Sequence, residues 1–70
     1  MQDTIDHTQT LVHRLLKAGK SHDEIAALFN GAVSVRSVYR WAKGEHAPKS
    51  LGIIIALENA LQVATEPAKQ

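Results

Sequence analysis

Two arginines, Arg36 and Arg40, stand one helical turn apart in the sequence, with Tyr39 beside the second and Lys43 one further turn along. A guanidinium group donates paired hydrogen bonds to planar acceptors and oxyanions, and a lysine adds a point charge. A tyrosine ring supplies an apolar face with a polar tip. Together these residues are suited to contact an anionic surface that carries hydrogen-bond acceptors.

Positive charge is concentrated around these residues, although the 70-residue chain has a net charge of only +1. Residues 34–49 contain one carboxylate and four cations, which are Arg36, Arg40, Lys43 and Lys49. The segments on either side carry a slight excess of acidic residues. This distribution indicates one basic face and not a uniformly charged surface.

Apolar residues recur at helical spacing along the whole chain, and no segment alternates like a strand. We expect helices from Asp3 or Thr4 to Gly19, over 22–29, over 35–43, and from Lys49 or Ser50 to Ala64. The residues that these helices turn inward are predicted to be Ile5, Thr8, Val12, Leu15, Leu16, Ile25, Leu28, Phe29, Val38, Trp41, Leu51, Ile54, Ile55, Leu57 and Leu61.

The expected helix ends carry recognisable signals. Ser21 and Glu24 match a capping box, and Ser34 can cap the helix that follows it. Gly19, the Asn30-Gly31 pair and Gly44 are residue types that adopt positive φ readily and so end helices. We therefore expect an all-α domain over 1–64 and a flexible tail over 65–70.

The composition favours a small cytoplasmic protein. The chain has no Cys and no apolar run near the ~20 residues that cross a bilayer, and its polar, acidic start is unlike a signal peptide. An aliphatic core in a chain this short is marginal alone, so partner association is expected to add stability.

The expected second and third helices are each too short to be stable alone, which favours a packed pair, the helix-turn-helix. With Val38 and Trp41 facing inward, the third helix turns an aliphatic residue, an aromatic residue and three cations outward. These outward residues are Val35, Arg36, Tyr39, Arg40 and Lys43. Such a helix suits the DNA major groove, where arginines pair with guanine and an aliphatic side chain touches a thymine methyl.

A resemblance to a known family is carried by the residues from Ser21 to Ala26, by those from Val33 to Gly44, and by Pro48. These residues resemble the lambda-repressor-like (Cro/C1-type) helix-turn-helix family, and the resemblance covers roughly Leu11 to Leu61. It implies a compact all-α domain of four or five helices that binds operator DNA, usually as a symmetric dimer. The chain departs from the family pattern in having two more residues between Ala26 and Val38.

Carried over to this sequence, the resemblance implies base-reading roles for Val35, Arg36 and Arg40, with Tyr39 beside them. Contacts to the DNA backbone are expected from His22, Ser34, Ser37, Lys43, His46 and Lys49. Ordinary explanations stay open for several of these residues. Arginines are common on solvated faces, a lysine near a helix end is also favoured by the helix dipole, and Tyr39 can simply cover its own helix.

Three consecutive isoleucines, Ile53 to Ile55, span more of a helix than one core contact needs. One hypothesis is a homodimer contact, formed by Ile53, Leu57, Ala60 and Ala64. The alternative is a slightly rotated helix with Ile53 at the edge of the core.

Enzymatic and metal chemistry find little support. The four histidines lack the i, i+3 or i, i+4 pairing typical of metal sites, and Ser21, His22 and Asp23 are adjacent and cannot form a catalytic relay. We therefore expect no enzyme activity, metal, cofactor, small-molecule ligand or membrane contact. The sequence predicts a transcriptional regulator, most simply a Cro-like repressor that acts by occupying operator DNA; the alternative is a protein-interaction module such as an antitoxin-type domain.

Overall fold

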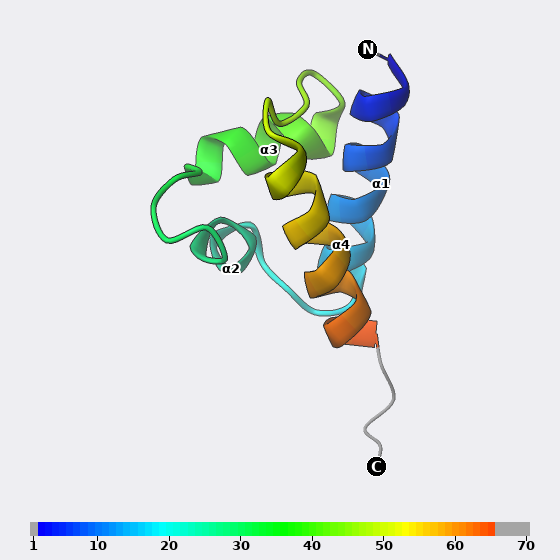
Figure 1. The fold of residues 1–70 in the computed structure, drawn as a ribbon. Helices are drawn as coiled ribbons and strands as arrows, with labels where there is room; N and C mark the ends of the chain where they lie inside the picture. Colours follow the sequence, from blue (N-terminus) through cyan, green and yellow to red (C-terminus); the bar gives the residue numbers. More distant parts are fainter. Residues whose placement is uncertain (1, 66–70) are drawn as a thin grey trace.

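The computed structural model of the protein describes residues 2–65. Within this range the chain forms four helices and no strand, which confirms the prediction of an all-α fold (Figure 1). The helices are α1 (Gln2–Lys17), α2 (His22–Ala27), α3 (Val35–Lys43) and α4 (Leu51–Thr65). Thr65, expected in the tail, belongs to α4, and the rest of the expected tail lies outside the described residues.

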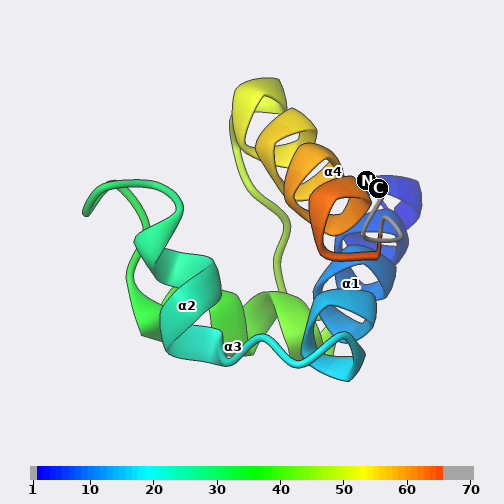
Figure 2. The ribbon, with the colours of Figure 1, turned by 90° about the horizontal axis from the view of Figure 1, so that it is seen from below.

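The first helix organises the other three. α1 contacts each of them, and α2 packs on α3 (Figures 1 and 2). Both views show α4 beside α1, with the short helices α2 and α3 grouped at one side of this pair. α3 therefore lies at the surface, supported from behind by α1.

The predicted helix ends are largely confirmed. The Ser21 hydroxyl accepts a hydrogen bond from the Glu24 amide at 3.1 Å, and the Glu24 carboxylate accepts one from the Ser21 amide at 2.8 Å. Gly19 has a φ of 104°, so α1 ends where a glycine meets no steric penalty. The second helix ends two residues earlier than predicted, because residues 28–31 form turns in which Asn30 and Gly31 adopt positive φ.

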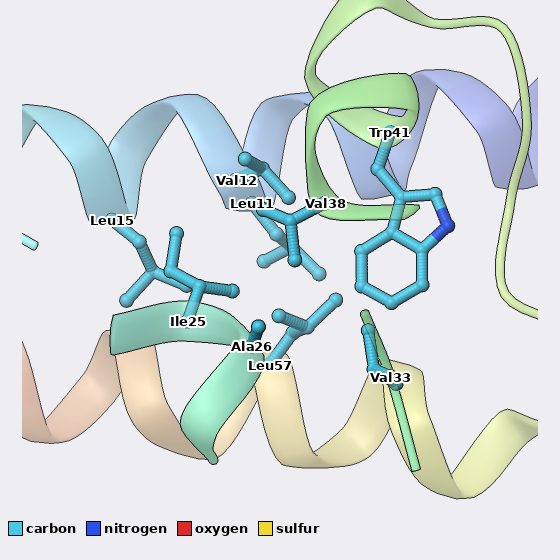
Figure 3. Close-up of a cluster of buried hydrophobic side chains, with 9 residues drawn as sticks. All are labelled: Leu11, Val12, Leu15, Ile25, Ala26, Val33, Val38, Trp41 and Leu57. Carbon is cyan, nitrogen blue, oxygen red and sulfur yellow. The ribbon is translucent and has the colours of Figure 1, made fainter. Parts of the chain in front are cut away.

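One cluster of apolar side chains joins all four helices, as Figure 3 shows. Its members are Leu11, Val12, Leu15, Ile25, Ala26, Val33, Val38, Trp41 and Leu57. Leu57 is the one buried residue of α4, and its side chain points into the cluster that α1, α2 and α3 supply. The attachment of α4 to the core therefore depends on a single fully enclosed leucine with half-buried neighbours.

Three of the residues predicted to face inward do not. Leu28 is 48% exposed, Ile55 46% and Leu51 69%. Leu28 lies in the turns after α2, so its direction does not follow the helical periodicity from which its burial was predicted. On α4, Ile55 is two residues before Leu57 and so about 200° away around the helix, which turns it outward when Leu57 is enclosed.

Thr8 carries a buried hydroxyl that has no hydrogen-bond partner among the described residues. Replacing an unsatisfied buried hydroxyl by a methyl group removes a desolvation penalty. We expect Thr8→Val to raise the free energy of unfolding by about 1 kcal/mol, since valine and threonine have similar helix propensities. Urea denaturation of both proteins measures the difference.

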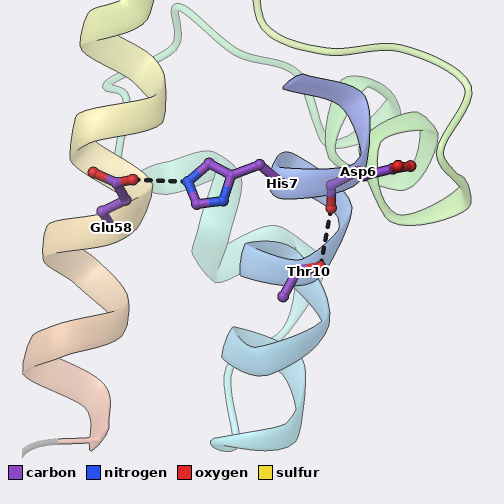
Figure 4. Close-up of polar contacts among 4 residues, drawn as sticks. All are labelled: Asp6, His7, Thr10 and Glu58. Atoms are coloured by element: carbon purple, nitrogen blue, oxygen red, sulfur yellow. Dashed lines mark hydrogen bonds and ion pairs between the residues drawn. The ribbon is translucent and has the colours of Figure 1, made fainter. Parts of the chain in front are cut away.

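A matched control is Thr10→Val on the same helix. The Thr10 hydroxyl is exposed and donates to the Asp6 carbonyl at 3.0 Å (Figure 4), so its loss should change stability by no more than about 0.5 kcal/mol. A Thr8→Val protein no more stable than wild type would show that the hydroxyl costs nothing where it lies.

α1 and α4 are also joined by a surface contact. His7 Nε2 lies 2.7 Å from Glu58 Oε2, and each side chain is about half exposed (Figure 4). Exposed pairs of this kind contribute little to stability. The packing of α4 is therefore set mainly by Leu57.

Candidate functional site

The position of α3 is secured by side chains of α1. Gln9 Nε2 donates to the Ala42 carbonyl oxygen at 3.0 Å, and His13 Nε2 donates to the same oxygen at 2.7 Å. This carbonyl belongs to the last turn of α3, where no backbone partner is available within the helix. Gly44 ends α3 with a φ of 76°, and a Cβ at this position would lie 3.1 Å from Gln9 Oε1. The positive φ favours glycine here, and a Cβ would also require the end of the Gln9 side chain to shift slightly.

The outer face of α3 carries the predicted cations. Arg36, Arg40 and Lys43 are all exposed, and at about 100° per residue they fall within an arc of roughly 60°. Val38 and Trp41, on the opposite face, are buried. No ion pair links these three cations to another residue within 2–65, so their charge faces solvent.

The other predicted α3 residues are only partly available. Val35 is half-buried and packs against the core, which departs from its expected outward position. The Ser34 hydroxyl caps the helix by accepting from the Ser37 amide at 3.2 Å, and it also lies 3.2 Å from the Ser37 hydroxyl. The two serines therefore stabilise the start of α3. Ser34 is exposed and Ser37 is half-buried, so Ser34 is the more accessible of the two to a ligand.

A ring stack joins α2 to the outer face of α3. The rings of His22 and Tyr39 are 3.9 Å apart between centroids and inclined by 12°. His22 is half-buried at the start of α2, and Tyr39 is 48% exposed on α3. The sequence predicted both as contact residues but gave no sign of the stack, because it depends on how the two helices cross. The stack restrains both rings on the flank of the cationic face.

A groove borders the other flank of this face. It has a volume of about 430 Å³ and lies between the turn before α3, α3 itself and the loop that leads to α4. The predicted backbone-contact residues His46 and Lys49 line it, together with Ser37 and Arg40. The sequence placed these residues in one charged segment but did not predict that they surround a hollow.

The residues expected to form a dimer contact do not share one surface. Leu57 is fully buried within its own chain, so its expected role in the interface is wrong. Ile53 lines the groove beside α3. Ala60 and Ala64 instead line a second hollow of about 430 Å³ between α2 and α4, whose rim includes the exposed Leu28 and Val63.

Among residues 2–65, no group of three or more histidine, aspartate or glutamate side chains is placed to hold a metal ion. None of the helices in this range is both long and apolar enough to cross a membrane. Comparisons with known proteins gave no match to any protein-family model, curated protein or solved structure.

Proposed function

We propose that the protein is a sequence-specific DNA-binding regulator in which α2 and α3 act as a helix-turn-helix and α3 enters the major groove. The observation that carries this proposal is the outer face of α3, where three unpaired cations share a narrow arc while α1 supports the helix from behind. A surface helix with this charge and shape matches the helices that read base edges. Such a protein would act as a repressor by occupying its operator.

The proposal assigns different contacts to different parts of the face. Arg36 and Arg40 would donate to guanine O6 and N7, and the exposed part of Val35 would touch a thymine methyl. Tyr39 would lie against the sugar-phosphate edge of the groove, restrained by His22. Phosphates would be contacted by the exposed Ser34, Lys43, His46 and Lys49 and by the half-buried His22 and Ser37.

We further propose a homodimer, because two copies related by a twofold axis would read a palindromic site. The apolar groove between α2 and α4 is the surface that supports it. Lys20 and Glu24 both line this groove, so a twofold contact there would bury residues of both charge signs at its edge. Leu28 and Val63 would be covered in the same contact.

Selection from random-sequence DNA tests the proposal. The bound fraction is sequenced after binding at two salt concentrations. We expect an enriched palindrome with half-sites about 10 base pairs apart, and weaker binding at the higher salt. Salt-sensitive binding without an enriched sequence would contradict a sequence-specific regulator.

Lys43→Ala should weaken binding to all DNA sequences to a similar extent. Lys43 is exposed at the end of α3, where a lysine neutralises a phosphate and reads no base. The slope of log affinity against log salt should fall by about one. Affinities for the selected operator and for random DNA, each measured over a salt series, check this. A change confined to the operator would instead assign Lys43 to base reading.

The α2–α4 groove also favours a second candidate function. Exposed apolar side chains around a hollow are typical of protein-interaction sites, and Leu28 and Val63 are 48% and 72% exposed. The chain would then be an interaction module that docks a different protein. Absence of DNA binding at low salt, together with a monomeric state in sedimentation, would favour this candidate.

A further inference from the structure

We propose that the groove beside α3 binds a small organic anion with an aromatic ring, of the aromatic carboxylate class. The groove lies between the turn before α3, α3 and the α3–α4 loop, and its volume of about 430 Å³ is within the range of small-molecule sites. Such sites combine apolar walls with a few polar groups that orient the ligand. Both kinds of group are present here.

The polar residues that line the groove are basic or uncharged, and none is acidic. Arg40, His46 and Lys49 line it, and no carboxylate does. None of these three basic side chains is paired with another residue in the described part of the chain. An anionic group in the groove would be lined by three basic residues and by no carboxylate.

The apolar side is built from residues of separate segments. Val33 precedes α3, Pro48 belongs to the following loop, and Ile53 comes from the first turns of α4. Their side chains give the ligand ring a surface that water cannot hydrogen-bond. An anion with a ring is therefore favoured over a bare inorganic anion, which would leave these walls wet.

Trp41 adds a hydrogen-bond donor to the same groove. It lines the groove and is only 5% exposed, and its indole N–H donates to no residue among 2–65. The indole nitrogen is not one of the buried polar atoms without a partner, so it is open to water or to a ligand. In Figure 3 it points away from the core cluster, toward the loop between α3 and α4. A carboxylate oxygen in the groove would accept from this N–H in place of water.

The proposal stands apart from DNA binding, since the groove and the indole donor are properties of the free chain. Four residues nevertheless belong to both surfaces, namely Ser37, Arg40, His46 and Lys49. If α3 binds DNA as proposed above, a carboxylate in the groove would compete with DNA for these side chains.

The test is a titration of the isotope-labelled chain without DNA, followed by nuclear magnetic resonance. The sequence has one tryptophan, so its indole N–H gives one identifiable signal in the groove. Naphthoate, neutral naphthamide and inorganic phosphate are the probes. We expect naphthoate to shift the indole signal saturably, and the two other probes to bind more weakly.

Variants assign the shift to the groove. Lys49→Gln and His46→Gln alter exposed side chains, and each should weaken naphthoate binding roughly two- to fivefold, as expected for one solvent-exposed ion pair. Lys17→Gln is the control, because it removes the same charge from α1, away from the groove, and should leave the affinity unchanged.

Three results would overturn the proposal. Equal binding of naphthamide would show that the cations contribute nothing, and equal binding of phosphate would show that the apolar walls contribute nothing. Naphthoate shifts centred on Leu28 and Val63 with an unmoved indole signal would place the ligand in the α2–α4 groove instead.

Discussion

Leu57→Ala should lower the free energy of unfolding by about 2–5 kcal/mol, the range measured for enclosed leucines in other proteins. Leu57 is fully buried and is the one α4 side chain in the core cluster. Its truncation removes apolar contacts within the core cluster and leaves a cavity there. Since the free energy of unfolding of a chain of this size is only a few kcal/mol, much of the folded population should be lost.

Urea denaturation followed by circular dichroism measures the effect, and Leu51→Ala is the matched control. Leu51 is the same residue type in the same helix but is 69% exposed, so its truncation should change stability by about 0.5 kcal/mol or less. Equal stability of the two variants would contradict the burial of Leu57 in the core and the packing of α4 that depends on it.

These two leucines also mark what the sequence could predict about the fold. Both were predicted to face inward, and one does. Helix ends such as Ser21 and Gly44 depend on interactions within a few residues, so local signals were sufficient to place them. The phase of α4 was ambiguous, because Ile53, Ile54 and Ile55 together span about 200° of the helix, more than one buried face needs. Only the contact with α1 selects the side that is buried.

The same distinction applies to the candidate site. The cationic face was predictable because the inward pair Val38 and Trp41 sets the phase of α3, and the outward residues follow from it. The His22–Tyr39 stack, the groove beside α3 and the exposure of Leu28 depend on helix crossings and on the path of loops. Sequence periodicity carries no information about helix crossings or loop paths. The dimer surface was predicted from α4 alone, and in the structure Ile53 lines one groove while Ala60 and Ala64 line another.

Arg40→Ala should reduce affinity for the selected operator by about 1–3 kcal/mol and relax the preference for one base position. Arg40 lies on the outer face of α3, between Arg36 and Lys43 along the helix, and is exposed and without an ion-pair partner in the described residues. Its guanidinium can donate two hydrogen bonds to a guanine, and alanine leaves those acceptors without donors. The measurement is the affinity of wild type and variant for the operator and for versions of it substituted at each position.

Arg14→Ala is the control, because it removes an equal charge from an exposed arginine of α1, and it should leave base preference unchanged. A nonspecific electrostatic role for Arg40 would instead weaken all sequences in parallel, as expected for Lys43→Ala. The position whose preference is lost would identify the base pair opposite Arg40, and Arg36, one turn earlier on the same arc, would be assigned to a neighbouring one. Unchanged affinity for the operator after Arg40→Ala would mean that another surface of the chain meets DNA, because this face cannot enter the groove without bringing Arg40 to the bases.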